Sequence, residues 1–218
     1  MPVELLAKSN LLHDELIAIY DSVAPYPERR FSLTMDACGI AFEHASGVQS
    51  LIAAGLHISA TALLRVQFEA LTRAMWLLYA ATDIEIEKLL APLNEDTQKT
   101  ANKLPMATEM LKALEKHGPS MAVRPLMQFK AISASPMNSY IHSGVHPLQR
   151  HREGFPAVLL YQLVISSNGL NTMCGMLTAV LTGHTSVVRT VRTLQTLFAE
   201  VLPPLEDAEK MASPNEQN

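Results

Sequence analysis

Charged residues are scarce in this sequence: they make up 17% of its 218 residues, whereas hydrophobic residues make up 48%. Such a balance predicts helices that are buried on more than one face, or a surface that an oligomer covers. The net charge of −4 at pH 7 excludes a global field that attracts nucleic acid. RNA as a partner would therefore need a local basic patch, for which the second half offers Arg150–Arg152 and the smaller pair Arg189 and Arg192.

Cysteine is almost absent, with Cys38 and Cys174 alone. Two cysteines in apolar runs are too few for a disulfide framework and predict reduced, buried thiols in a cytoplasmic protein. The N-terminus Met1–Glu4 has no basic region followed by an apolar one, so no signal peptide is expected. The sequence also lacks a Gly-x-Ser-x-Gly elbow, a phosphate loop and a dinucleotide-binding glycine pattern, and no cofactor is predicted.

The apolar residues recur with helical periodicity nearly everywhere, and alternating strand-like runs are missing. This pattern predicts an all-α fold: a single antiparallel helical bundle of about six to eight helices over residues 1–211, followed by a disordered tail at 212–218. A polar segment at 92–104 is expected to be a solvated helix or a connector, and 149–154 a basic loop. The longer helices are expected at 3–23, 29–54, 58–81, 105–117, 121–132, 156–181 and 186–201, and shorter ones at 82–90 and 137–143.

One stretch without any formal charge, Gly154–Val188, is long enough to span a bilayer. Polar side chains crowd its middle, however, which argues against a membrane span. We therefore predict a core or interface helix and no membrane partner. The polar residues concerned are Gln162, Ser166, Ser167, Asn168 and Asn171.

A polar stripe runs along the expected helix at 58–81. Arg65, Glu69 and Arg73 follow one another at intervals of four residues, so neighbouring side chains carry opposite charges. One interpretation is a solvated face with a weak salt-bridge ladder. The other is a cleft in which glutamate holds arginine as a preorganised anion-binding fork. On the second interpretation Arg65 and Glu69 are candidate catalytic residues, and Arg73 and Trp76 are candidate ligand-binding residues.

The densest run of reactive side chains is Asn138–Pro147. In this run His142 is a candidate general acid or base, with Tyr140 as an accessory catalytic hydroxyl. Ser139 and His146 are candidate ligand-binding residues. The alternative is that a histidine at a helix end caps carbonyl groups or fills a polar gap. The two histidines are four residues apart, as metal ligands on a helix are, but a glycine and a proline interrupt that spacing, and no metal site is assigned.

Two segments carry a resemblance to a known group of proteins. The first is Ala62–Ala70 together with Trp76–Tyr79, and the second is Tyr140–Pro147. A Leu-Arg-x-x-x-Glu helix combined with a Tyr-x-His segment resembles a group of uncharacterised bacterial helical proteins, which are distantly similar to the HEPN superfamily. The resemblance implies an antiparallel helical bundle, frequent dimerisation, and an RNase or nucleotide-related role in some relatives.

Active HEPN nucleases carry an arginine followed by a histidine after four to six intervening residues. None of the nine arginines in this chain has a histidine at that distance. If the chain cleaves RNA, Arg65 or Arg150 would have to supply the cation.

Three functions remain open from the sequence. The first is a self-associating helical protein, a homodimer linked to stress or phage defence. The second is a HEPN-like, metal-independent RNase or toxin, in which His142 transfers protons and Arg65 stabilises the scissile phosphate. The third is a bundle that binds a small ligand or a metal. The second and third require His142 to lie within hydrogen-bonding reach of Arg65 and Glu69.

Overall fold

The structure, a computed structural model, describes residues 3–92, 94–95, 99 and 104–204. Every regular element among these residues is helical, which confirms the all-α prediction. They form nine α-helices and one 3-10 helix, more than the six to eight expected. The polar segment predicted at 92–104 lies largely outside the described residues, and the tail at 212–218 entirely. The helices are α1 (Val3–Ser22), α2 (Arg29–Ala53), α3 (His57–Tyr79), α4 (Asp83–Leu90), α6 (Ala107–His117), α7 (Ser120–Ile141), α8 (Val145–Glu153), α9 (Ala157–Thr182), α10 (Thr185–Leu197) and the 3-10 helix η1 (Ala199–Val201).

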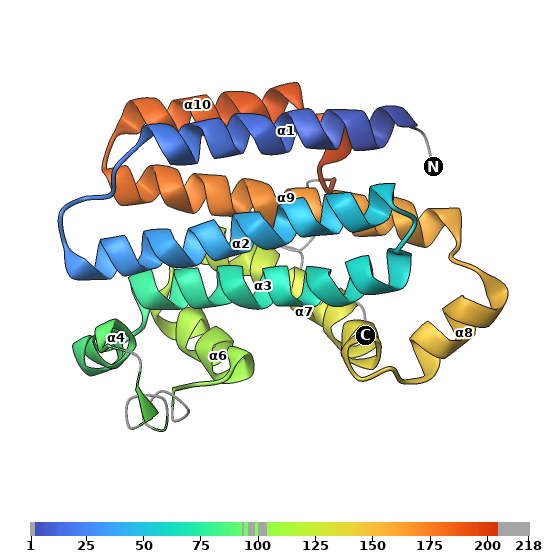
Figure 1. The fold of residues 1–218 in the computed structure, drawn as a ribbon. Helices are drawn as coiled ribbons and strands as arrows, with labels where there is room; N and C mark the ends of the chain where they lie inside the picture. The colour runs from blue at the N-terminus through green and yellow to red at the C-terminus, as the bar shows by residue number, and fades with distance from the viewer. Residues whose placement is uncertain (1–2, 93, 96–98, 100–103, 205–218) are drawn as a thin grey trace, which may run out of the picture.

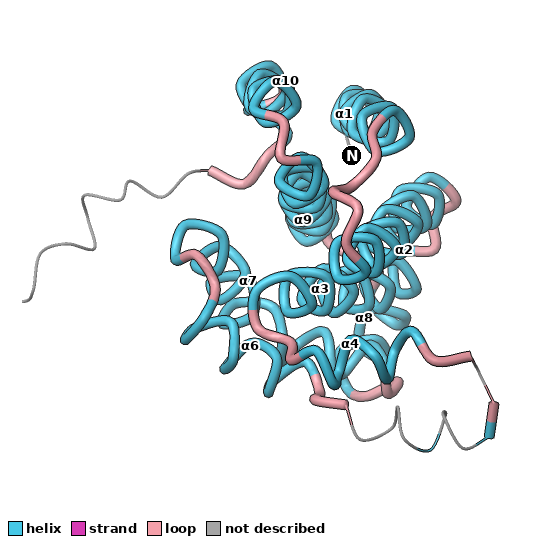
Figure 2. Tube along the Cα trace, turned by 90° about the vertical axis from the view of Figure 1, so that its left-hand side faces the viewer, coloured by secondary structure: helices cyan, strands magenta, loops and turns pink. Residues whose placement is uncertain are grey.

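The helices are stacked in layers (Figures 1 and 2). Helices α1 and α10 lie side by side on one outer face, and α2 and α9 lie beneath them. Helix α3 follows, and α4, α6 and α7 cover the opposite face. Helix α8 projects at the end of the molecule where α9 begins.

Helix α3 occupies the centre of the fold. It contacts α2, α6, α7 and α9, and no residue from Ala60 to Ala80 is classed as exposed. The large side chains Phe68, Leu71 and Trp76 are completely enclosed. Burial on all sides explains why this helix is apolar over so much of its circumference. Its polar stripe is partly exposed: the side chain of Arg65 is 16% exposed and that of Glu69 is 42% exposed.

Helix α9 lies within the uncharged stretch Gly154–Val188. It is the one helix of the described residues that is long and apolar enough to cross a membrane, but 72% of its most apolar window is buried inside the structure. It packs against α1, α2, α3 and α10 as a core helix. It ends at Gly183, whose φ of +70° is the left-handed conformation that glycine adopts without strain.

Local signals placed several helix ends correctly. Thr82 caps α4, because its hydroxyl accepts a hydrogen bond from the Glu85 backbone N–H while the Glu85 carboxylate accepts one from the Thr82 N–H. After α2, Gly55 adopts a φ of +75°, as expected for a residue that follows a helix. The last helix, in contrast, stops at Leu197 and continues only as the 3-10 turn to Val201.

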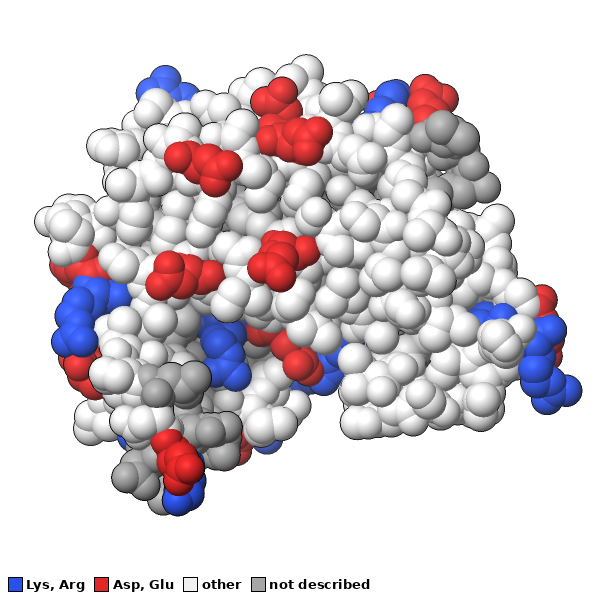
Figure 3. Space-filling view, viewed as in Figure 1, with Lys and Arg blue, Asp and Glu red and all other residues white. Residues whose placement is uncertain are grey.

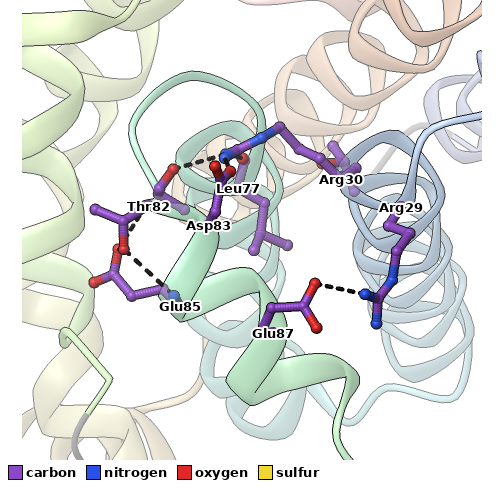
Figure 4. Close-up of polar contacts among 9 residues, drawn as sticks. Arg29, Arg30, Leu77, Thr82, Asp83, Glu85 and Glu87 are labelled. Carbon is purple, nitrogen blue, oxygen red and sulfur yellow. Dashed lines mark hydrogen bonds and ion pairs between the residues drawn. The ribbon is translucent and has the colours of Figure 1, made fainter.

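Arginine side chains of α2 hold the C-terminal end of α3 and the start of α4 (Figure 4). Arg30 donates to the Leu77 carbonyl at 2.6 Å, to the Ala81 carbonyl at 2.7 Å and to the Asp83 carboxylate at 2.7 Å. Arg29 pairs with Glu87 at 2.6 Å. A cation at the carbonyl end of a helix satisfies free acceptors and matches the helix dipole. The contacts of Arg29 and Arg30 therefore fix the end of α3 and the start of α4 against α2.

Helix α7 contradicts the predicted break between 132 and 137. It runs without interruption from Ser120 to Ile141 and contains Pro125 and Pro136. A proline inside a helix removes one hydrogen bond and normally favours a break. Here tertiary packing outweighs that cost, since side chains at both ends of the helix, such as Leu126 and Tyr140, are buried.

The prediction of a basic loop at 149–154 is also wrong, because residues 149–153 belong to α8 and only its C-cap residue, Gly154, lies outside the helix. Pro147 does not end a helix but lies in the first turn of α8, where a missing N–H costs nothing. Arg150, His151 and Arg152 then occupy the last turn, next to the carbonyl end that favours positive charge.

Candidate functional site

Arg65 and Glu69 form the polar link between the centre of α3 and the C-terminal half of α7. Arg65 Nε donates to Glu69 Oε1 at 2.7 Å, and Arg65 Nη1 donates to Asn138 Oδ1 at 2.9 Å. The Arg65 side chain is only 16% exposed. The pair of charges is thus held in place by a helix that is far away in the sequence.

The other two candidate residues of α3, Arg73 and Trp76, lie in different surroundings. Arg73 is half-buried and forms no hydrogen bond or ion pair with any described residue. Burial lowers the pKa of its guanidinium, and the nearby Glu69 carboxylate opposes that effect. Trp76 is 2% exposed and belongs to the hydrophobic core, so it has no surface to offer a ligand.

The predicted residues of the histidine segment connect α7 to α8. Ser139 Oγ accepts a hydrogen bond of 3.1 Å from the His146 backbone N–H and so caps the first turn of α8. The Tyr140 ring is stacked on the His146 ring, with centroids 6.3 Å apart. Burial raises the pKa of the Tyr140 hydroxyl, and the positive charge of Arg150 counteracts part of this rise.

His142 lies at the C-terminal cap of α7. Its backbone N–H donates to the Asn138 carbonyl at 3.2 Å, and its side chain is exposed. Asn138 therefore touches Arg65 through its side chain and His142 through its backbone. No hydrogen bond joins the His142 side chain to Arg65 or Glu69 among the described residues.

The structure thus separates the predicted site residues into two clusters. Arg65 and Glu69 bridge α3 and α7, whereas Ser139, Tyr140 and His146 bridge α7 and α8. Among the described residues, no group of three or more histidine, cysteine, aspartate or glutamate side chains is placed to hold a metal ion.

A buried polar network along α9 was missed by sequence reasoning. Gln67 of α3 and Ser167 of α9 exchange two hydrogen bonds, from Gln67 Nε2 to the Ser167 carbonyl at 3.1 Å and from Ser167 Oγ to Gln67 Oε1 at 2.8 Å. Asn168 Nδ2 donates to Ser9 Oγ at 2.8 Å and to the Val201 carbonyl at 2.9 Å. The polar residues in the uncharged stretch were the available signal, but the sequence does not show which partners they meet.

The same network contains a buried histidine. His13 of α1 is 8% exposed, and its Nδ1 lies 3.1 Å from Asn171 Nδ2. A neutral ring with its proton on Nε2 accepts this hydrogen bond. Asn171 Oδ1 is buried and has no hydrogen-bond partner among the described residues. Burial lowers the pKa of His13, while the Asn171 contact and the negative charge of Asp14 act in the opposite direction.

We expect His13 to make the protein less stable as the pH falls below the ordinary histidine pKa of about 6.5. In that range the unfolded chain binds a proton that the folded chain does not, and the free energy of unfolding decreases by at most about 1.4 kcal/mol per pH unit. The loss levels off below the lowered pKa of the folded state. Urea unfolding between about pH 8 and about pH 5 measures it.

His13→Gln is the matched variant, because it removes the titrating group from α1. We expect the stability of this variant to fall less steeply with decreasing pH than that of the wild type. If the free energies of unfolding of the two proteins changed with pH in parallel, His13 would not be the titrating group.

Comparison with protein families gives one match. A model described as a family of unknown function (DUF6988) matches residues 38–204. The match includes both clusters of predicted site residues, whereas α1 with His13 lies outside it. Neither the curated proteins nor the solved structures give a match.

Proposed function

The chain belongs to the family of unknown function DUF6988, and on this premise we propose that it acts as a self-associating helical protein. In this proposal one antiparallel bundle pairs with a second copy of itself through the end of the molecule formed by α8 and the start of α9. The observation that carries the proposal is a group of exposed apolar side chains at this end.

We call this group the apolar end. Its members come from the end of α7, from α8, from the first turns of α9 and from the α2–α3 connection. Leu148 is 61% exposed and Val158 is 60% exposed, although large aliphatic side chains normally avoid water. The apolar end consists of Leu56, Ile141, Val145, Leu148, Val158 and Tyr161.

These side chains converge on one region of the fold. The rings of His57, which follows Leu56, and Phe155, which precedes α9, have centroids 5.4 Å apart, so the start of α3 lies beside the α8–α9 connection. Figure 1 shows α8, the start of α9 and the α2–α3 connection together at the right-hand end of the molecule. In the same view, Figure 3 shows that the surface of the right half is almost uncharged apart from its outer edge.

A second copy of the chain is the partner that the charge distribution favours. A two-fold contact buries the same surface of both copies, so a charge close to the two-fold axis meets its own copy. Residues 154–188 of α9 and its flanks, and residues 44–64 of α2 and α3, contain no aspartate, glutamate, lysine or arginine. Arg152 and Glu153 of α8 are exposed and supply the polar rim that interfaces commonly have.

Replacing Leu148 or Val158 with glutamate is expected to prevent self-association. A carboxylate at either position would be desolvated opposite its symmetry mate, which disfavours the contact. We expect the wild type to sediment as a dimer at micromolar concentration and each variant to sediment as a monomer with unchanged helical circular dichroism.

Leu11→Glu is the matched control, since Leu11 is equally exposed but lies on α1. The control is expected to remain dimeric. A monomeric wild type would overturn the proposal, and so would a dimer that only Leu11→Glu disrupts.

The setting of this function is also a proposal. The resemblance described above suggests a bacterial, cytoplasmic protein linked to stress or phage defence. The mostly buried uncharged helix is consistent with a protein that does not span a membrane. No contact in the described residues favours the nuclease or the metal-binding alternative over association.

A further inference from the structure

The only two cysteines of the chain meet in the core of the fold. Cys38 lies on α2 and Cys174 on α9, 136 residues further along the chain. The Cys174 thiol donates a hydrogen bond of 3.4 Å to the backbone carbonyl of Cys38. Both thiols are free and buried, as the sequence predicts. The packing of α2 against α9 therefore brings together two side chains that can react with each other.

The two thiols also interact electrostatically. Burial raises the pKa of the Cys174 thiol well above its ordinary value, and a hydrogen bond with the Cys38 side chain and the charge of Cys38 add to that rise. The thiolate is the form of cysteine that reacts with disulfides. Both thiols are thus protected in the folded protein, and we expect them to react with each other while α9 is still packing against α2.

We propose that Cys38 and Cys174 are a disulfide site, which closes when the chain folds in the presence of an oxidised low-molecular-weight disulfide such as oxidised glutathione. A disulfide joins residues whose Cα atoms are about 4.4–6.8 Å apart, and the Cys174 thiol already touches the main chain of Cys38. The next buried residues on this face of α2, Ala41 and Ala45, have small side chains, which leave room for a neighbouring helix close to the main chain.

The reaction consists of two exchange steps. One protein thiol loses its proton and attacks a sulfur of oxidised glutathione, which forms a mixed disulfide and releases one molecule of glutathione. The second protein thiol loses its proton, attacks the protein sulfur of the mixed disulfide, forms the bond between Cys38 and Cys174, and releases the second glutathione. The two protons pass to the released thiolates. Two protein thiols are thereby oxidised, and one glutathione disulfide is reduced.

The cross-link joins α2 to α9 and encloses α3 to α8 in one loop of the chain. A disulfide stabilises a fold by restricting its unfolded chain, and it does so more strongly when the loop is long. To test the proposal, the full-length protein is unfolded in urea and refolded with either reduced or oxidised glutathione. With the oxidised form we expect a single chain that has lost the mass of two hydrogen atoms and retains its helical circular dichroism. Its folding equilibrium constant should be about 100-fold higher than that of the reduced protein.

A displaced pair of cysteines is the matched control. The double variant with Cys38→Ala and Ala37→Cys moves the thiol of α2 by one position, to another buried residue that points in a different direction around the helix axis. We expect oxidation to add little stability to this variant. Wild-type protein that keeps both thiols free, a disulfide between two chains, an oxidised form no more stable than the reduced one, or equal stabilisation of the displaced pair would overturn the proposal. Neither cysteine belongs to the apolar end, so the result is independent of self-association.

Discussion

Trp76→Ala is expected to lower the free energy of unfolding by about 3–5 kcal/mol. Trp76 is among the largest fully enclosed side chains, and its removal leaves a cavity between α3 and its neighbours that the packed core cannot fill completely. This loss is a substantial part of the total stability of an ordinary domain.

Urea unfolding followed by circular dichroism measures this effect, because the variant loses the only tryptophan of the chain and with it the fluorescence signal. Trp76→Phe is the control and should cost much less, since it retains most of the buried ring. A Trp76→Ala protein with nearly wild-type stability would show that the indole is not a core residue and would restore its predicted role in ligand binding.

Asn168→Ala is expected to destabilise the protein by about 2–6 kcal/mol. Its amide donates to Ser9 Oγ at 2.8 Å and to the Val201 carbonyl at 2.9 Å, which ties α9 to α1 and to the 3-10 turn. The substitution leaves two buried acceptors without these donors, and each such loss costs about 1–3 kcal/mol. Exchange of backbone amide hydrogens should become faster in α1 and around Val201, because the hydrogen bonds from Asn168 to these segments are lost.

Asn10→Ala provides the comparison for this effect. Asn10 follows Ser9 on α1 but is exposed, so its replacement should change the free energy of unfolding by less than about 0.5 kcal/mol. If Asn168→Ala were equally mild, water or a rearranged side chain would have to replace the amide, and the buried network would not be a stabilising element.

The parts of the fold that the sequence predicted correctly depend on neighbouring residues. Thr82 with Glu85 defines the start of α4, and Gly55 and Gly183 mark helix ends, because capping and positive φ angles act within a few residues. The Arg65–Glu69 contact belongs to the same class, since residues four apart on a helix are always neighbours.

The predicted helix boundaries were wrong where packing against distant residues outweighs a local structural preference. Pro136 predicts a break, yet α7 continues through it because both ends of this helix pack into the fold. Pro147 likewise suggests an end but lies in the first turn of α8, whose His146 N–H is capped by Ser139 from the preceding helix. Local propensity is weaker than the burial of a long helical face.

For the candidate site, the sequence by itself determined a helical chain with few charges, the opposite charges along α3, and the identity of its reactive side chains. These follow from composition and from helical periodicity, which need no knowledge of distant contacts. Only the tertiary structure decided that Arg65 reaches Asn138, 73 residues away, that Trp76 is a core residue, and that the exposed His142 forms no hydrogen bond with Arg65 or Glu69 among the described residues. Which faces of two helices meet is set by the packing of the whole core, and that packing is not encoded in any single segment.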